Sequence, residues 1–320
     1  MRTKKNAKIL FRLTLLAIII GLCGLVFAQK HESDKAGSAS ADDGKLRIIV
    51  FGAHPDDCEQ KAGGVAAMWA ARGHHVKFVS TTNGDIGHAE MAGGQLAKRR
   101  TAEVKKAAKI LGIDQSDVLD IHDGELMPTL ENRRKIVRLI RDFKADIVMS
   151  HRPNDYHPDH RYTGVLIQDA AFMVTVKFFC NDVPQLPKNP VFLYLADNFQ
   201  KPNPFAPDIV VGIDDVFAQK FDAIWKLESQ IESLWATGNF ENVVPVPTEP
   251  VARQERQEQV RRRLARRDQA VAEKYRDKLI ELYGKDKAEK IQYAEAFEIC
   301  EYGRRPTQDE LKKLFPLPQQ

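Results

Sequence analysis

The sequence predicts an α/β fold: a Rossmann-like, mostly parallel sheet with helices on both faces, extended by helices at the C-terminal end. Two observations carry this prediction. Between residues 46 and 151, short runs rich in Val, Ile and Phe alternate with stretches of helical period. Loops rich in His, Asp and Gly follow these short runs. Alternation of strands and helices at this spacing is typical of βαβ units, in which neighbouring strands run parallel.

The first elements are defined by apolar runs and by the glycines that follow the helices. Residues 46–52, LRIIVFG, form a short β-branched run with the character of a buried parallel strand. A helix is expected at 62–72, because Gly73 supplies a helix stop directly after it. The next strand, at 75–82, leads to a helix at 96–111 that is again followed by a glycine.

The same alternation predicts the later elements of the sheet. Strands are expected at 118–122, 146–151, 191–196 and 209–213. Helices are expected at 133–143 and from 216 to about 235.

The segment after residue 235 differs in composition. Three prolines fall between 237 and 250, so this stretch is expected to be a loop. Residues 253–283 form a long, charged helical stretch whose arginines are interleaved with acidic residues. This interleaving favours a solvated helix face over a surface for an acidic partner. We therefore assign 46–235 to the main domain and 236–320 to a loop and helical extension that complete the same domain.

The N-terminal segment has the pattern of an export signal. Residues 1–28 carry five basic residues and no acidic one, and their apolar run ends in Val-Phe-Ala before Gln29. This run is shorter than the ~20 apolar residues that a membrane-spanning helix needs. We expect a signal peptide at 1–28, a flexible polar linker at 29–45 and an exported protein, periplasmic or secreted. The alternative is an uncleaved segment that anchors the protein in a membrane.

The charge limits which partners the protein can be expected to bind, and the cysteine content limits how far disulfides can stabilise the fold. The formal net charge is +4, but the five basic residues of the N-terminal segment leave −1 for the remainder. A nearly neutral body removes the electrostatic argument for a nucleic-acid partner. Only Cys58, Cys180 and Cys300 follow that segment, which excludes a dense disulfide framework.

The loops after the first four predicted strands gather chemically active side chains. Ligands of open parallel sheets bind beyond the carboxyl ends of the strands. The loops in question are 52–57 (GAHPDD), 81–88 (TTNGDIGH), 122–124 (HDG) and 151–160 (HRPNDYHPDH). They converge on one edge of the sheet, so we expect an active site there. The first loop lacks Gly-x-Gly-x-x-Gly and carries a carboxylate pair, which excludes a dinucleotide site.

The residue types in these loops favour a catalytic metal. Zinc in catalytic sites takes three nitrogen or carboxylate ligands and keeps a fourth position for water. His54, either Asp56 or Asp57, and either His157 or His160 would supply such a set. A bound ion would lower the pKa of its water toward ~7. The remaining aspartate would then take a proton from that water as general base.

At these residues the chain resembles the LmbE-like, or PIG-L, family of zinc-dependent de-N-acetylases. The family signatures Ala-His-Pro-Asp-Asp and His-Pro-Asp-His stand intact at 53–57 and 157–160. The resemblance covers roughly residues 46–230 and a short C-terminal piece. Its weaker matches are Gly63-Gly64, 82–84 with Gly87, Arg100, Glu103, Asp123-Gly124, Ser229-Gln230 and 294–297. The chain departs from the family at Cys58, where many members carry Glu, and at 238–290, which has no counterpart.

The resemblance implies a role for each motif residue. His54, Asp57 and His160 match the zinc ligands, with another divalent metal such as Fe²⁺ as the alternative ion. Asp56 matches the family's general base. These two assignments separate Asp56 from Asp57, which the residue types alone do not.

The second motif and two other positions match groups that act on the substrate. His157 matches the histidine that stabilises the oxyanion or protonates the leaving amine, and Asp159 the carboxylate that orients it. Arg100 and Asp123 are expected to contact sugar hydroxyls.

The expected activity is removal of the acetyl group from an N-acetylglucosaminide-type sugar, a small molecule or a glycan, giving acetate and a free amine. The alternatives are a zinc amidase or peptidase that acts on a non-sugar acyl amine, and a non-catalytic sugar-binding relative. The motifs specify the chemistry and leave the sugar and the oligomeric state open. Export favours a cell-envelope or environmental glycan over a cytoplasmic substrate.

Overall fold

A single mixed sheet organises the computed structural model, which describes residues 43–233 and 242–317. Within these residues the sheet has the strand order β3-β2-β1-β4-β5-β7-β6. The strands are β1 Arg47–Gly52, β2 His75–Ser80, β3 Gln115–Val118, β4 Ile147–Ser150, β5 Val191–Leu195, β6 Ile209–Gly212 and β7 Ala294–Ile299. Strands β1 to β5 pair in parallel, whereas β7 runs antiparallel to β5 and β6. The predicted signal peptide and almost all of the predicted linker lie outside the described residues.

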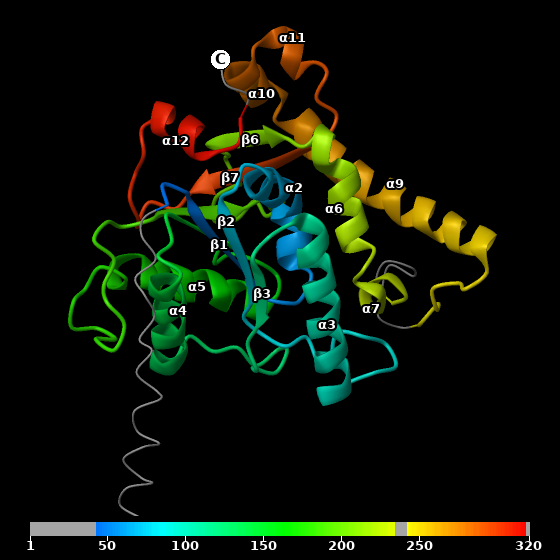
Figure 1. Cartoon of the computed structure of the whole chain (residues 1–320), viewed down its shortest axis with the longest axis horizontal. Coiled ribbons are helices and arrows are strands. Elements are labelled where there is room, and N and C mark those ends of the chain that lie inside the picture. Colours follow the sequence, from blue (N-terminus) through cyan, green and yellow to red (C-terminus); the bar gives the residue numbers. More distant parts are fainter. Residues whose placement is uncertain (1–42, 234–241, 318–320) are drawn as a thin grey trace, which may run out of the picture. The chain divides into compact units, whose positions relative to one another are not determined.

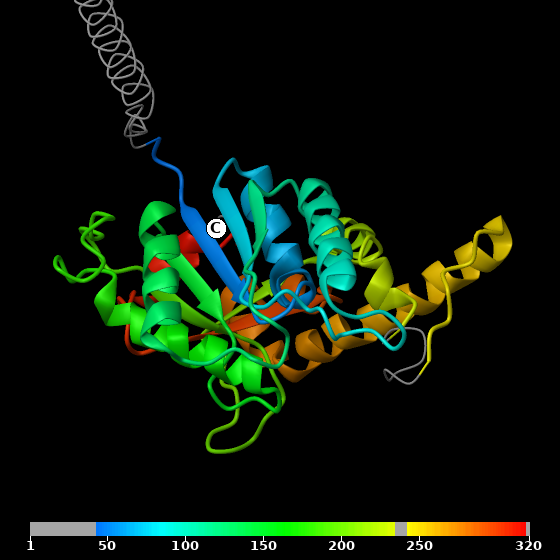
Figure 2. The same cartoon turned by 90° about the horizontal axis from the view of Figure 1, so that it is seen from below.

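Helices cover both faces of the sheet, as the alternating pattern predicts (Figures 1 and 2). Successive residues of β1 point to opposite faces, as strand geometry requires. Ile48 and Val50 belong to one apolar core, and Ile49 and Phe51 to another. The first core includes α2 (Asp57–Ala71) and α3 (Gly94–Leu111), and the second includes α4 (Leu130–Asp142) and α5 (Pro158–Met173). Buried strands with two covered faces explain the nearly continuous apolar runs.

The remaining helices come from the C-terminal half of the chain. They are η1 Asp214–Val216, α6 Phe217–Ile224, α7 Glu228–Ile231, α9 Pro250–Lys274, α10 Arg276–Tyr283, α11 Lys285–Ala288 and α12 Gln308–Leu314. The first part of α9, yellow in Figure 1, extends away from the other elements, whereas its last part, orange, lies beside β7. No helix in the described part of the chain has the length and apolar character to cross a membrane.

Several predicted elements differ from the structure. The third strand was expected at 118–122, but β3 lies earlier, at Gln115–Val118, and has the mostly polar sequence QSDV. This strand lies at the edge of the sheet, so one of its backbone edges has no neighbouring strand, and polar residues are tolerated there. The apolar Leu119 and Ile121, which suggested the strand, pack against the second core from the loop that follows.

The predicted helices at 216–235 and 253–283 are each interrupted. The first becomes α6 and the short α7, and its predicted last residues lie outside the described part. The second ends at Lys274 and resumes at Arg276 as α10. Strand β7 was not predicted as a strand, since only its pairing between β5 and β6 buries AEAFEI.

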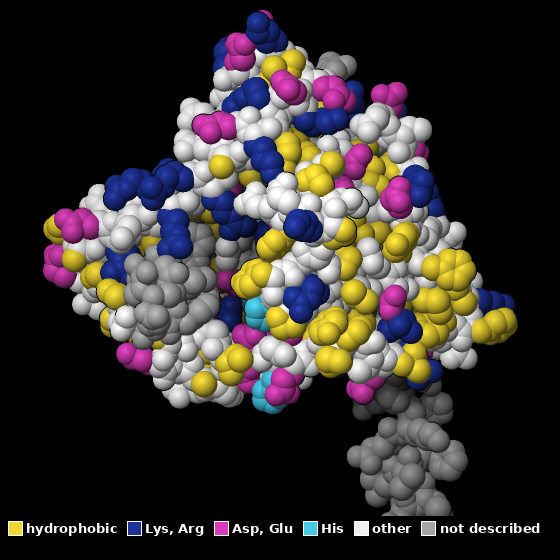
Figure 3. Space-filling model, turned by 180° about the vertical axis from the view of Figure 1, so that it is seen from behind, with side chains coloured by type: hydrophobic (Ala, Val, Ile, Leu, Met, Phe, Trp, Pro, Cys, Tyr) yellow, Lys and Arg dark blue, Asp and Glu magenta, His cyan; other side chains and the backbone are white. Residues whose placement is uncertain are grey.

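The three cysteines of the described residues are free and buried. The surface charge agrees with the balanced composition. On the face shown in Figure 3, basic side chains are scattered among acidic and apolar ones.

Candidate active site

The loop after β1 is shaped by the aspartate that begins α2. Oδ2 of Asp57 accepts hydrogen bonds from the backbone N–H groups of Ala53 (2.9 Å) and His54 (2.8 Å). The strand must therefore pass close to this side chain. A Cβ at position 52 would lie 2.7 Å from the Cβ of Asp57, which explains the glycine that ends β1. This tight turn directs His54 and Asp57 to the same side.

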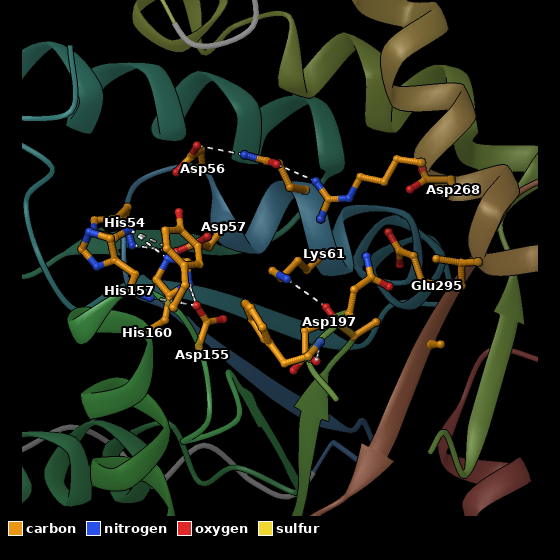
Figure 4. Close-up of a pocket in the computed structure, with 18 of the residues that line it drawn as sticks. His54, Asp56, Asp57, Lys61, Asp155, His157, His160, Asp197, Asp268 and Glu295 are labelled. Carbon is orange, nitrogen blue, oxygen red and sulfur yellow. Dashed lines mark hydrogen bonds and ion pairs between the residues drawn. The ribbon is translucent and has the colours of Figure 1, made fainter. Parts of the chain in front are cut away.

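Three side-chain atoms converge at the carboxyl end of the sheet with the spacing of metal ligands (Figure 4). Nδ1 of His54 lies 3.2 Å from Nε2 of His160. Oδ2 of Asp57 lies 3.6 Å from the first of these nitrogens and 3.5 Å from the second. Two ligands bound about 2.0–2.1 Å from a tetrahedral zinc are about 3.4 Å apart. The residues therefore fit a divalent ion, which would sit among lone pairs that otherwise face one another.

The second ring nitrogen of each histidine faces a carboxylate. Nε2 of His54 lies 3.0 Å from Asp123 and 3.4 Å from Asp159. Nδ1 of His160 lies 3.1 Å from Asp155. Metal-binding histidines commonly have such a partner, which fixes the orientation of the ring. Burial opposes protonation of His54, but the neighbouring carboxylates outweigh it and raise the pKa of His54 well above its usual value.

Other clusters of potential ligand atoms overlap this triad. Asp57, His151 and His160 offer atoms within 4.8 Å of one another, as do two sets that include His54. The ring of His151 is buried, stacks on that of His160 and lies 3.2 Å from Asp57. Burial lowers the pKa of His151 to about 4, so this ring is neutral. His54, Asp57 and His160 line the adjoining cavity and His151 does not, which favours the His54 triad.

Asp56 is held through both of its carboxylate oxygens. Nη2 of Arg100 donates to Oδ1 over 3.1 Å, and Nε2 of Gln60 donates to Oδ2 over 2.8 Å. Burial raises the pKa of Asp56, against the lowering effect of Arg100. A fixed carboxylate with a raised pKa suits a general base. Arg100, predicted to contact the sugar, lines the cavity and is buried against Asp56 and the carbonyl of Gly84.

His157 lies at the start of α5. Its Nδ1 accepts a hydrogen bond from the backbone N–H of Asp159 over 3.2 Å, so it caps the helix. Its ring meets that of His54 edge-on, with centroids 4.6 Å apart. Burial, with His54 and His160 nearby, lowers the pKa of His157.

The carboxylate of Asp159 does not have the contacts that the resemblance implies. It accepts hydrogen bonds from the backbone N–H groups of Gly124 (2.6 Å) and Leu126 (3.2 Å), and it also faces His54. The reason is local: position 159 follows the helix cap, so its fully buried side chain points under the 122–126 loop. Asp159 therefore contacts His157 through its backbone N–H, and its carboxylate does not orient the His157 ring.

A cavity of about 690 Å³ adjoins the triad and is lined by residues far apart in the sequence. His54, Asp57 and His160 lie at one end of it. Residues of α9 and β7, including Asp268 and Glu295, lie at the other. The helix expected to be a solvated face therefore contributes one side to the cavity.

Comparison with known proteins places these features in a family. The family model "PIG-L: GlcNAc-PI de-N-acetylase" matches residues 49–171. Diacetylchitobiose deacetylase of Thermococcus kodakarensis is 33% identical over 233 residues, which cover 66% of this chain and 84% of that protein. The chain belongs to the PIG-L family. Another similar protein, 4-oxalmesaconate hydratase of Pseudomonas putida, is 25% identical over 195 residues, which cover 58% of this chain and 74% of that protein.

Solved structures show that the chain has the PIG-L fold. N,N'-diacetylchitobiose deacetylase from Pyrococcus horikoshii aligns with a TM-score of 0.60 at 23% identity, over 80% of this chain and 84% of that one. The 4-carboxy-2-hydroxymuconate hydratase from Pseudomonas putida aligns with a TM-score of 0.61 at 20% identity, over 82% and 98%. The α/β prediction, with its mostly parallel sheet, is confirmed.

Sequence reasoning missed three members of this PIG-L site. Asp155 faces His160, Gln60 holds Asp56, and Arg267 of α9 reaches Gln60. Asp155 had a local signal, because it lies in the loop beside the second motif. Arg267 had none, since it is distant in the sequence and shares its helix with many other arginines.

Proposed function

We propose that this protein is a zinc-dependent hydrolase that removes the acetyl group from an N-acetylated sugar and releases acetate and a free amine. The observation that carries the proposal is the triad of His54, Asp57 and His160 beside the base Asp56, in one cavity. The similarity to a diacetylchitobiose deacetylase supports a sugar acetamide as substrate. The N-terminal segment supports export, with a glycan as substrate.

The metal and its ligands define where the amide is cleaved. His54, Asp57 and His160 would hold zinc, the ion that suits two imidazoles and a carboxylate. When bound, zinc supplies a Lewis acid that polarises a carbonyl and makes water more acidic. The cavity leaves room for the acetamide next to these ligands.

The chain's own groups move the protons. Asp56 takes a proton from the attacking water, while Arg100 and Gln60 keep its carboxylate in place. His157, at the rim of the same cluster, interacts with the acetyl oxygen or gives a proton to the leaving amine. Asp123 and Asp155 hold the two ligand histidines in orientation.

Acetate release from purified protein tests the proposal. Protein loaded with zinc should release acetate from N,N'-diacetylchitobiose, and more slowly from acylated non-sugar amines and peptides. Asp56→Asn should keep its zinc and lose activity by at least about 100-fold, the usual weight of a general base. Activity retained by Asp56→Asn, or activity only on peptides, would contradict the proposal. Because a similar protein is a hydratase, the same protein should also be tested for water addition to an unsaturated acid.

A further inference from the structure

The cavity contains a second group of polar side chains, away from the metal-binding residues. Lys61 of α2, labelled in Figure 4, lines the cavity, and so does Arg267 of α9. Lys61 lies one turn after Asp57 on the same helix, so it stands beyond the metal-binding end. Arg267 also donates to Gln60, but none of the roles proposed above uses the charge of either cation.

The carboxylates that line this part of the cavity are already paired. Asp197 accepts hydrogen bonds from Nε and Nη2 of Arg152. Asp268 and Glu295 lie 2.7 and 2.9 Å from Nζ of the fully buried Lys220. Asp197 therefore has a cation of its own, whereas Asp268 and Glu295 share one lysine; each of the three has a cationic partner other than Lys61 and Arg267.

The two cations have neutral partners instead. Nζ of Lys61 donates to the carbonyl of Ala196 over 2.8 Å, and Nη1 of Arg267 donates to Oε1 of Gln60 over 2.5 Å. Across residues 43–233 and 242–317, neither cation has a carboxylate oxygen within 4.0 Å. Burial, and then the nearby charge of Arg267, lower the pKa of Lys61. Two like charges at one cavity wall are unfavourable unless an opposite charge joins them.

We infer that Lys61 and Arg267 form an anion subsite, which binds a carboxylate, phosphate or sulfate group on the substrate beyond its acetamide. This inference rests on the proposed deacetylase function and names the substrate class: an acidic N-acetylated sugar. Arg267 offers a planar fork for two oxygens of such a group, and Lys61 adds a point charge. A neutral sugar would leave both cations without a direct carboxylate partner.

The subsite also fits the size of the cavity. A volume of about 690 Å³ lies in the middle of the range for pockets that enclose drug-sized ligands, roughly 300–1,000 Å³. The metal-binding residues occupy only one end of it. The anionic group therefore belongs to the far side of the reacting sugar or to the unit attached to it.

Matched substrates test the inference with zinc-loaded, full-length mature protein. The neutral probes are N-acetylglucosamine and N,N'-diacetylchitobiose, so that each acidic probe is compared with a neutral sugar of the same number of units. The acidic probes are the 6-phosphate and 6-sulfate of N-acetylglucosamine, N-acetylmuramic acid, and a disaccharide of N-acetylglucosamine and glucuronic acid. We expect kcat/KM to be about tenfold or more higher for at least one acidic probe, as charge-assisted hydrogen bonds allow. The probe preferred identifies phosphate, sulfate or carboxylate as the group bound.

Variants of Lys61 and Arg267 test whether these two cations cause the preference for an acidic probe. Lys61→Gln and Arg267→Gln should each lower the acidic-to-neutral ratio of kcat/KM, and the double variant should bring it near one. Arg267→Lys should restore part of the ratio, and the exposed neighbour Arg266→Gln should keep it whole. Because the ratio compares two substrates on one protein, it cancels a general loss of activity or of folded protein.

Two failures remain distinguishable. If the protein deacetylates neutral and acidic sugars equally well, or if the double variant keeps the acidic preference, the anion subsite is wrong and the deacetylase function stands. If no N-acetylated sugar in the panel loses acetate, the proposed function fails with it. Raising NaCl from about 20 to 500 mM should weaken the preference, because salt screens the attraction between the cavity cations and an acidic probe that approaches from solution.

Discussion

Gln60 connects the proposed general base to a helix about 200 residues further along the chain. Its Nε2 donates to Oδ2 of Asp56 over 2.8 Å, and its Oε1 accepts from Arg267 of α9 over 2.5 Å. The two contacts fix the orientation of the amide, since each end can serve only one of these partners. The C-terminal extension therefore reaches the reacting end of the cavity.

Replacing Gln60 should impair the general base. Gln60→Leu removes a hydrogen bond that favours the charged form of Asp56, so the pKa of Asp56 should rise further. We expect kcat to fall about tenfold and the acidic limb of the pH–rate profile to move to higher pH. Gln254→Leu, at an exposed position of α9, is the matched control. An unchanged pH profile in Gln60→Leu would show that the contact does not tune Asp56.

Metal content should distinguish the two overlapping triads. His54→Ala should lose most of its bound zinc, whereas His151→Ala should retain it, because His151 does not line the cavity. Equilibrium dialysis followed by elemental analysis measures both variants. The reverse pattern would assign the ion to Asp57, His151 and His160 instead.

The carboxylate beside His160 should contribute to metal affinity without binding the metal. Asp155→Asn should weaken zinc binding by about 10–100-fold, the usual effect of removing such a partner. Competition with a chromophoric chelator gives the dissociation constant. Asn154→Ala, at the preceding half-buried position, serves as the control, and equal affinities in both variants would contradict the role of Asp155.

Glu59 should make the protein less stable as pH rises. Its side chain is buried, and burial raises its pKa to about 8 from the ordinary value of 4.5. The folded state therefore binds a proton that the unfolded state has lost, and stability falls between about pH 4.5 and 8. Glu59→Gln removes this effect and should stabilise the protein by up to roughly 3 kcal/mol at pH 7, but little at pH 4.5.

Thermal unfolding at the two pH values measures this difference. Glu131→Gln, at an exposed position in the first turn of α4, should show no such pH dependence. A Glu59→Gln variant that is equally stable relative to the parent at both pH values would contradict the buried neutral carboxyl.

The buried lysine that joins α6, α9 and β7 should be essential for stability. Lys220→Met leaves Asp268 and Glu295 buried without their cation. Removing one partner of a buried ion pair typically costs about 3–5 kcal/mol. Urea unfolding of Lys220→Met should show this loss of stability. Urea unfolding of Lys226→Met, which changes a lysine outside this network, should not. A loss below about 1 kcal/mol would mean that water or protonation compensates the carboxylates.

Much of the fold and of the reacting end could be predicted from the sequence. The alternation of strands and helices indicates a parallel sheet, and its strand-end loops bring His54 and Asp57 close to His160. These signals are local, because a short apolar run or a five-residue motif can be recognised from its own residues, without knowledge of distant segments. β7 could not be predicted in the same way, because AEAFEI becomes a strand only between two others.

The sequence by itself determined the sheet, the edge that carries the loops and the residue types that suit a catalytic metal. Only the tertiary structure decided which groups support them. In the folded protein Asp159 accepts a hydrogen bond from the 122–126 loop, Asp155 faces His160, and Arg267 donates to Gln60. The physical reason is that motif residues are positioned by their own turn, whereas a partner from α9 or β7 is selected by packing between distant segments. The same packing brings Lys61 of α2 and Arg267 of α9 to one cavity.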